Sequence, residues 1–138
     1  MKLYRPEIRF RDMDAMGHVN NATYFTYMEQ ARIQYFRDLR VEKWDWIEEG
    51  VVVAKNELNY KTPLFFDDEV VIKTFCSHLG NKSVTLTSNI FKIVKSQEIL
   101  AAHGACVLVS FNHKTQQTQD IPGFWRSLLQ QDLEENQV

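Results

Sequence analysis

Residues 12–39, DMDAMGHVNNATYFTYMEQARIQYFRDL, join a short polar segment to the most apolar helix that the sequence predicts. From Ala22 to about Leu39, apolar and aromatic residues recur at intervals of three and four, which is the period of a helix with a buried face. Two tyrosines and an alanine widen this stripe to nearly half of the circumference. We therefore expect a long helix that neighbouring elements cover on several sides.

The segments around this helix predict a sheet. Residues 2–11 have the pattern of a first strand, and after Gly50 the hydrophobic period changes to two. Pro122 then begins a short amphipathic helix that ends at Leu133. Because strands in succession favour antiparallel hairpins, the order indicates an α+β layout in one domain over residues 1–138. Four further strands are predicted at 51–60, 69–78, 83–94 and 99–111, a short helical turn at 44–49, and a frayed end at 130–138.

Charge and composition exclude several classes of protein. The chain has 138 residues, with 16 Lys and Arg against 18 Asp and Glu, so it offers no broad basic surface for nucleic acid or an anionic membrane. The N-terminal residues lack the apolar run of a signal peptide, and no stretch approaches the ~20 apolar residues of a membrane span. Cys76 and Cys106 lie in apolar segments, which indicates buried thiols in a cytoplasmic protein, with a single bridge between strands as the alternative.

Most common catalytic motifs are absent from the sequence. The four histidines show no spacing typical of a zinc site, and no Gly-x-Ser-x-Gly elbow is present. Residues 80–83, GNKS, lack the first glycine of a phosphate-binding P-loop. They predict a hairpin turn, or else a turn whose lysine contacts a ligand phosphate.

The polar segment 11–21, RDMDAMGHVNN, is the best candidate for a site. The start of a helix presents unpaired N–H groups and a partial positive charge, which polarise a carbonyl and stabilise an oxyanion. A nearby carboxylate can attack that carbonyl or activate a water, and His18 can orient or protonate. These parts suit acyl transfer to water, although Asp and Asn are also ordinary helix caps and turn formers.

This segment also carries a family resemblance. Residues 9–21, RFRDMDAMGHVNN, followed by Tyr24 and by MEQAR at 28–32, resemble the 4-hydroxybenzoyl-CoA thioesterase family of hotdog-fold acyl-CoA thioesterases. The resemblance covers nearly the whole chain. It implies an α+β hotdog fold, in which a curved antiparallel sheet of about five strands wraps a long central helix and a short helix follows. It also implies hydrolysis of an acyl-CoA thioester to the free acid and CoA.

The resemblance assigns roles residue by residue. The catalytic aspartate of the family matches Asp14, as nucleophile or general base, and the backbone N–H that polarises the thioester carbonyl matches Asn21. Asp12 is then structural, and His18 is expected to assist catalysis. The expected contacts with the substrate are Asn20, Tyr24, Lys82 and Ser83, with the last two near the CoA phosphates.

The resemblance also implies a partner and leaves two alternatives. Exposed sheet edges invite pairing, so we expect a homodimer, or a homotetramer built from it, with sites at the subunit interface. No cofactor is expected, because CoA is part of the substrate. The alternatives are a non-catalytic module that binds acyl-CoA or an acyl carrier, and a thioesterase that acts on acyl-carrier protein.

Overall fold

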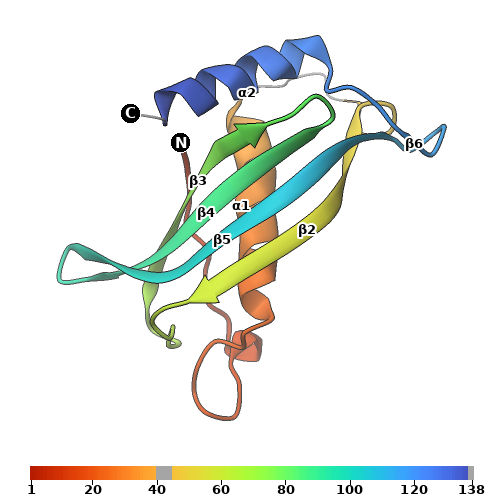
Figure 1. The fold of residues 1–138 in the computed structure, drawn as a ribbon. Helices are drawn as coiled ribbons and strands as arrows, with labels where there is room; N and C mark the ends of the chain where they lie inside the picture. The colour runs from red at the N-terminus through yellow and green to blue at the C-terminus, as the bar shows by residue number, and fades with distance from the viewer. Residues whose placement is uncertain (40–44, 137–138) are drawn as a thin grey trace.

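The computed structural model describes residues 1–39 and 45–136, and in these ranges six strands form one antiparallel sheet (Figure 1). The strand order is β1-β3-β4-β5-β2, with β6 beside β5. The four long strands match the predicted strands to within two residues at each end, because their alternation of apolar residues is strong. The strands are β1 (Lys2–Tyr4), β2 (Gly50–Tyr60), β3 (Glu69–Leu79), β4 (Ser83–Val94), β5 (Gln97–Asn112) and β6 (Gln117–Thr118).

The predicted first strand over residues 2–11 is wrong for most of its length. Only β1 pairs with β3, and it ends two residues before Pro6. Proline has no N–H to donate to a ladder and restricts the residue before it, so the pairing stops there. The chain then forms a 3-10 turn, η1 (Phe10–Asp12), which leads into the polar segment.

Helix α1 (Thr23–Asp38) has 16 residues and lies across one face of the sheet (Figure 1). Its bounds agree with the predicted helix to within one residue at each end. The expectation of a long helix covered on several sides is not met, because Glu29, Gln30 and Ile33 are exposed. The sheet therefore covers one side of α1, and the opposite side is exposed to solvent.

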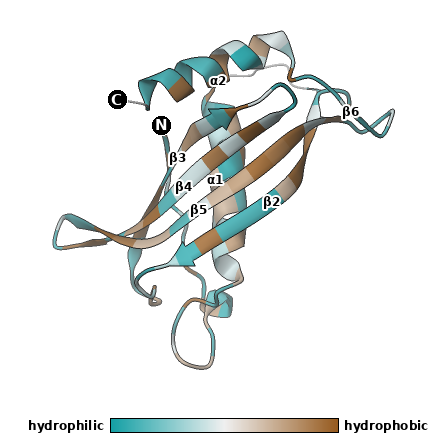
Figure 2. Cartoon of the chain, in the orientation of Figure 1, coloured by the Kyte–Doolittle hydropathy of each residue, from teal (hydrophilic) through white to brown (hydrophobic). Residues whose placement is uncertain are grey.

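Helix α2 (Gly123–Glu135) closes one end of the space between α1 and the sheet. It continues two residues beyond the predicted end and runs through much of the segment predicted to fray. Polar and apolar residues alternate along it (Figure 2), as expected of a helix with one buried face. Trp125 and Leu129 of that face are fully buried.

The core consists of two clusters along α1. The first lies at the start of the helix and includes Tyr24, Tyr27 and Met28, and the second lies at its end, under α2. Cys76 and Cys106 are buried free thiols, as predicted. Leu86 of β4 lies between them in the register, so two strand spacings of about 4.8 Å separate the cysteines, which is too far for a disulfide.

Two further predictions concern a short helical turn and membrane-spanning segments. The predicted turn at 44–49 begins at Trp44, which lies outside the described residues, and its remainder forms one turn in which Glu49 N–H donates to Asp45 O at 2.8 Å. No described helix is long and apolar enough to span a membrane.

Candidate functional site

The loop between η1 and α1 is built around Asp14. The Asp14 Oδ1 atom accepts hydrogen bonds from Met16 N–H at 2.9 Å and His18 N–H at 3.1 Å. The backbone N–H of Asp14 donates to His18 O at 2.7 Å, and Gly17 has the positive φ of 82° that this tight loop requires. The carboxylate is therefore fixed through one oxygen, and Oδ2 makes no hydrogen bond with the described residues.

Asp12 fixes the loop to α1, which agrees with the structural role expected for it. Its Oδ2 atom accepts from the Tyr27 hydroxyl at 2.7 Å and from Arg9 N–H at 2.9 Å, while its carbonyl accepts from Asn20 N–H at 2.8 Å. Burial, followed by the bond to Asp12, raises the pKa of Tyr27, which therefore stays a neutral donor. The loop is thus anchored at both of its ends.

The start of α1 is shaped by the neighbouring residues Asn20 and Asn21. Asn20 Oδ1 accepts from Ala22 N–H at 2.8 Å, so the Asn20 side chain forms a turn at the start of the helix. The Asn21 N–H makes no hydrogen bond within the described residues, whereas its carbonyl accepts from the Tyr60 hydroxyl at 2.7 Å. Tyr60 thereby holds the Asn21 peptide from β2. A free amide at this position can donate to an oxyanion.

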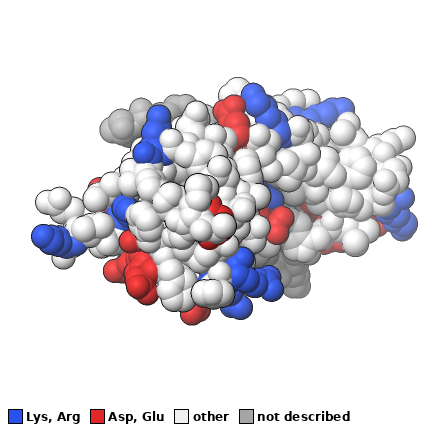
Figure 3. Space-filling model, turned by 90° about the horizontal axis from the view of Figure 1, so that it is seen from below, with Lys and Arg blue, Asp and Glu red and all other residues white. Residues whose placement is uncertain are grey.

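The pocket that Asp14 enters is apolar and has a volume of about 550 Å³. Its walls include Phe10 and Phe66, whose rings meet edge to face with centroids 6.3 Å apart. Phe10 is 84% exposed. Seen from below, this end of the molecule is mostly uncharged, with separate acidic and basic groups (Figure 3). The surroundings of Asp14 therefore suit an apolar group.

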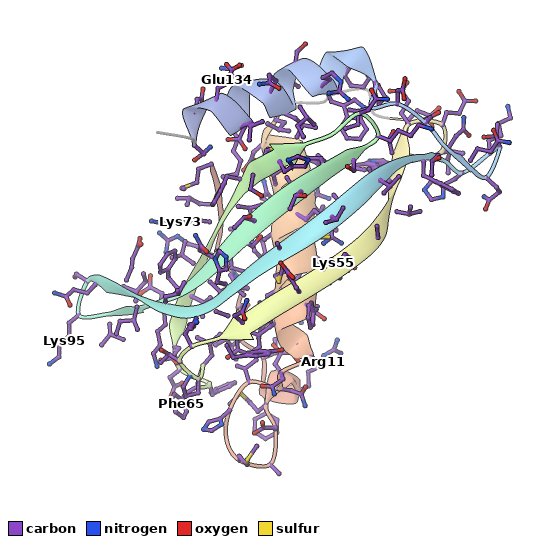
Figure 4. All side chains as sticks on the ribbon, viewed as in Figure 1. Arg11, Lys55, Phe65, Lys73, Lys95 and Glu134 are labelled. Carbon is purple, nitrogen blue, oxygen red and sulfur yellow. The ribbon has the colours of Figure 1, made fainter. Side chains whose placement is uncertain are left out.

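Sequence reasoning missed these walls. Phe65 and Phe66 lie between β2 and β3, just after Pro63 and Leu64, and both are exposed. Two neighbouring aromatic residues in a segment with a turn signal were what the sequence offered. Figure 4 shows Phe65 close to the loop at the lower end of the molecule.

His18 and Tyr24 take other positions. The His18 ring packs edge to face on Phe65 at 5.2 Å between centroids and makes no hydrogen bond with the described residues, so only its backbone contacts Asp14. Tyr24 is 2% exposed, and its hydroxyl accepts from Leu64 N–H at 3.3 Å. Burial raises the pKa of Tyr24. Tyr24 therefore anchors Leu64, whose carbonyl in turn accepts a hydrogen bond from Val19 N–H at 2.8 Å.

Lys82 and Ser83 lie far from Asp14 in the same chain. They form the turn between β3 and β4, at the end of the molecule that α2 covers, whereas the Asp14 loop lies at the opposite end (Figure 1). Arg126 of α2 fixes this turn by donating to Gly80 O at 2.8 Å and Asn81 O at 2.7 Å. One chain thus brings together Asp14, His18, Asn20, Asn21 and Tyr24, and it separates Lys82 and Ser83 from them.

Comparison with known proteins shows the family of the chain. Residues 8–132 match the model of the thioesterase-like superfamily. A long-chain acyl-CoA thioesterase of Escherichia coli is 27% identical over 126 residues, which cover 91% of this chain and 94% of that protein. Matches to two further curated relatives cover only 53% and 58% of their lengths.

Solved structures show the same fold. A Thermus thermophilus thioesterase, solved with coenzyme A and zinc, is 34% identical and superposes with a TM-score of 0.80 over 96% of this chain and 94% of the other. A 4-hydroxybenzoyl-CoA thioesterase superposes with a TM-score of 0.84 over 93% of this chain and 97% of the other, and at 14% identity it supports the fold alone. The hotdog resemblance is confirmed.

Proposed function

This chain belongs to the thioesterase-like superfamily and is a thioester hydrolase, and we propose that it cleaves acyl-CoA thioesters with Asp14 as the catalytic carboxylate. The assignment rests on the hydrogen bonding of the two oxygens of the Asp14 carboxylate. Two amides hold Oδ1, while Oδ2 is unpaired among the described residues and the side chain borders an apolar pocket. An oriented carboxylate beside an acyl pocket is the arrangement that attack on a thioester requires.

Two routes use the same atoms. In the first, Asp14 Oδ2 attacks the carbonyl carbon, the C–S bond breaks, CoA leaves as the thiolate, and water hydrolyses the mixed anhydride. In the second, Oδ2 takes a proton from water as the oxygen of that water adds to the carbonyl, and the thiolate then leaves. In both routes the Asn21 N–H donates to the oxyanion, with the partial positive charge of the α1 start behind it.

We assign His18 and Asn20 supporting roles. The His18 ring has both nitrogens unpaired among the described residues and stands on Phe65, so it can protonate the departing thiolate. Asn20 shapes the helix start through its bond to Ala22 N–H and so fixes the turn that contains Asn21. Tyr24 acts on the substrate through the position of Leu64.

The assembly that we propose is a homodimer joined through β2. This strand forms a sheet edge of 11 residues, and its residues 53–57 are all exposed. The other edge is partly covered, because β1 pairs with β3 and α2 packs against it. A second copy paired along β2 provides hydrogen-bond partners for the backbone N–H and C=O groups of this exposed edge. Two such dimers would make a tetramer. The free buried thiols of Cys76 and Cys106 support a cytoplasmic location.

The test is hydrolysis of short, long and aromatic acyl-CoAs by the wild type and by Asp14→Asn. The Asn Oδ1 still accepts both loop amides, so we expect an intact fold, retained CoA binding, and kcat lower by about 10³-fold or more. Asp67→Asn, an exposed aspartate in the loop before β3, is the matched control with normal kcat. Full turnover by Asp14→Asn would refute the assignment.

The second candidate function, a non-catalytic acyl-CoA binding module, is favoured by the way that Asp14 Oδ1 already caps its own loop. Tight binding of acyl-CoA without hydrolysis of any member of the panel would support that function instead. If the enzyme hydrolyses thioesters of acyl-carrier protein in preference to acyl-CoA, the thiol carrier of its substrate is acyl-carrier protein rather than CoA.

A further inference from the structure

A second pocket, of about 500 Å³, lies beside the Asp14 loop and is polar rather than apolar. It is bounded by the N-terminal segment and by the exposed side of α1, with Arg5, Arg9 and Arg11 on one side and Gln30 on the other. Figure 4 shows Arg11, which belongs to η1, at the lower end of the molecule. Three guanidinium groups around one hollow distinguish this place from the mixed charges elsewhere on this end.

Two of these arginines have no acidic partner. Arg9 and Arg11 form no ion pair within the described residues, whereas Arg5 lies 3.4 Å from Glu69 and both members of that pair are exposed. The carboxylates in the pocket are Asp12, whose Oδ2 already accepts two hydrogen bonds, and the exposed Glu7.

The pocket also contains a neutral hydrogen-bond donor, the side-chain amide of Gln30. Gln30 Oε1 accepts from the Tyr4 hydroxyl at 3.1 Å, which leaves the two N–H groups of the Gln30 amide free to donate. Guanidinium groups bind phosphate oxygens bidentately and are weakly hydrated, so they suit phosphate recognition better than lysines do. The pocket therefore combines unpaired positive charge with neutral donors, which is the chemistry that binds a phosphate.

The position of this pocket relates it to Asp14. Turn η1 separates the two pockets, since Phe10 lines the apolar pocket while Arg9 and Arg11 line the polar one. Asp12 lines the polar pocket and Asp14 lines the apolar one, and residues two positions apart are separated by at most about 7 Å of chain. The pantetheine arm that joins the sulfur of CoA to its phosphates is longer than that, so one CoA thioester can occupy both pockets.

We propose that the pocket formed by Arg5, Arg9, Arg11 and Gln30 binds the phosphate groups of CoA while the thioester lies at Asp14. This inference rests on the proposed function. It replaces Lys82 as the phosphate contact within one chain, because the turn between β3 and β4 that holds Lys82 lies at the end covered by α2, opposite the loop between η1 and α1 (Figure 1). The substrate then runs across η1, with its acyl group in the apolar pocket.

The experiment compares two substrates that share the whole pantetheine arm and differ only in the nucleotide. Acyl-CoA carries the phosphates, and the S-acyl-pantetheine of the same acyl group has none. For the double variant Arg9→Gln, Arg11→Gln, we expect the ratio of kcat/KM for acyl-CoA to kcat/KM for the truncated thioester to fall by about tenfold or more, mainly through KM. Tenfold corresponds to one lost charge-assisted hydrogen bond. Arg37→Gln, an exposed arginine at the other end of α1, is the matched control, and Lys82→Gln tests the rival contact.

A binding measurement separates this inference from the proposed activity. Calorimetry with 3′,5′-ADP, and with adenosine as the probe without phosphate, requires no hydrolysis. Weaker 3′,5′-ADP binding by the double variant supports the pocket even if the wild type hydrolyses no acyl-CoA. If the double variant keeps both its affinity and its substrate ratio while Lys82→Gln loses them, the pocket is not the phosphate site, and the proposed hydrolysis still stands.

Discussion

Tyr60 of β2 links the sheet to the end of the Asp14 loop by one hydrogen bond. Its hydroxyl donates to Asn21 O at 2.7 Å, and the ring packs edge to face on Tyr24 at 5.0 Å between centroids. Because the peptide groups on both sides of Asn21 are part of the helix start, this bond orients the amide that we assign to the oxyanion. Tyr60 is therefore a positioning residue, which acts through Asn21 rather than on the substrate.

Tyr60→Phe removes that hydroxyl and keeps the ring. We expect kcat for acyl-CoA to fall about fivefold, the effect of losing one hydrogen bond worth about 1 kcal/mol, with KM unchanged. Because Tyr60 is 44% exposed, the free energy of unfolding should change by less than about 1 kcal/mol. Steady-state kinetics and urea unfolding measure both quantities. A lower free energy of unfolding together with a normal kcat would show that Tyr60 does not position the Asn21 amide for catalysis.

Asp132 is the most buried carboxylate described, and it ties α2 to the core. Its Oδ2 accepts from the Tyr35 hydroxyl and from Cys76 N–H, each at 2.7 Å. Burial alone raises the pKa of a carboxyl, but the amino group of Met1, the Cys76 amide and the Tyr35 hydroxyl together hold the pKa of Asp132 below its ordinary value of 3.8. The folded state therefore favours the charged form.

Asp132→Asn should lower the free energy of unfolding by about 1–3 kcal/mol at pH 7, because an acceptor of buried donors is lost. A carboxyl whose pKa is lowered by folding stabilises the protein above its unfolded pKa, and this stabilisation disappears as the pH falls through the folded pKa. The difference between wild type and variant should hence be full at pH 7 and smaller at pH 3. Urea unfolding at both pH values measures it, and a difference that does not depend on pH would contradict the assignment.

At the residue scale, the sequence predicted what is local and missed what is not. Asp14 and the Asn21 amide belong to one loop, so their spacing alone brought them together. Phe66 reaches the same pocket from the loop between β2 and β3, and its place depends on how β2 and β3 are arranged in the sheet. The unpaired state of Arg9 and Arg11 depends on the 3-10 turn, which the strand pattern of residues 2–11 concealed.

At the element scale, α1 approaches β5 closely at Gly104. A Cβ added there would lie 2.7 Å from Met28 Cε and 2.8 Å from Leu58 Cδ1. The sequence showed only a glycine within a strand pattern, whereas the structure shows that the side chains of Met28 from α1 and Leu58 from β2 fill the space beside it. The long strands were predictable from their alternation, but this contact between a helix and a distant strand was not.

Gly104→Val should therefore destabilise the protein by about 1–3 kcal/mol through overpacking beneath α1. Ala105→Val is the matched control, because Ala105 is half-buried on the opposite face of the same strand and should change stability by about 0.5 kcal/mol or less. Thermal and urea unfolding of the two variants give the comparison. Equal effects of the two substitutions would show that the close approach does not limit the side chain at 104.

At the scale of the whole molecule, the homodimer that we propose forms through the exposed edge of β2. Ala54 is the bulged residue of this edge: Val53 pairs with Leu108 and Lys55 pairs with Val107, so Ala54 has no register partner in β5. A substitution there can alter pairing along the free edge without removing a paired residue from the β2–β5 ladder.

We expect light scattering to give the wild type at micromolar concentration a mass of about twice 16.3 kDa, or a multiple of that dimer. Ala54→Pro places a ring and removes an N–H at the edge, so it should shift the mass toward 16.3 kDa, with circular dichroism showing a retained fold. Since the proposed sites lie at the interface, kcat/KM for acyl-CoA should fall in parallel, while Ala54→Ser keeps both mass and activity. A monomeric wild type with full activity would show that one chain completes its own site.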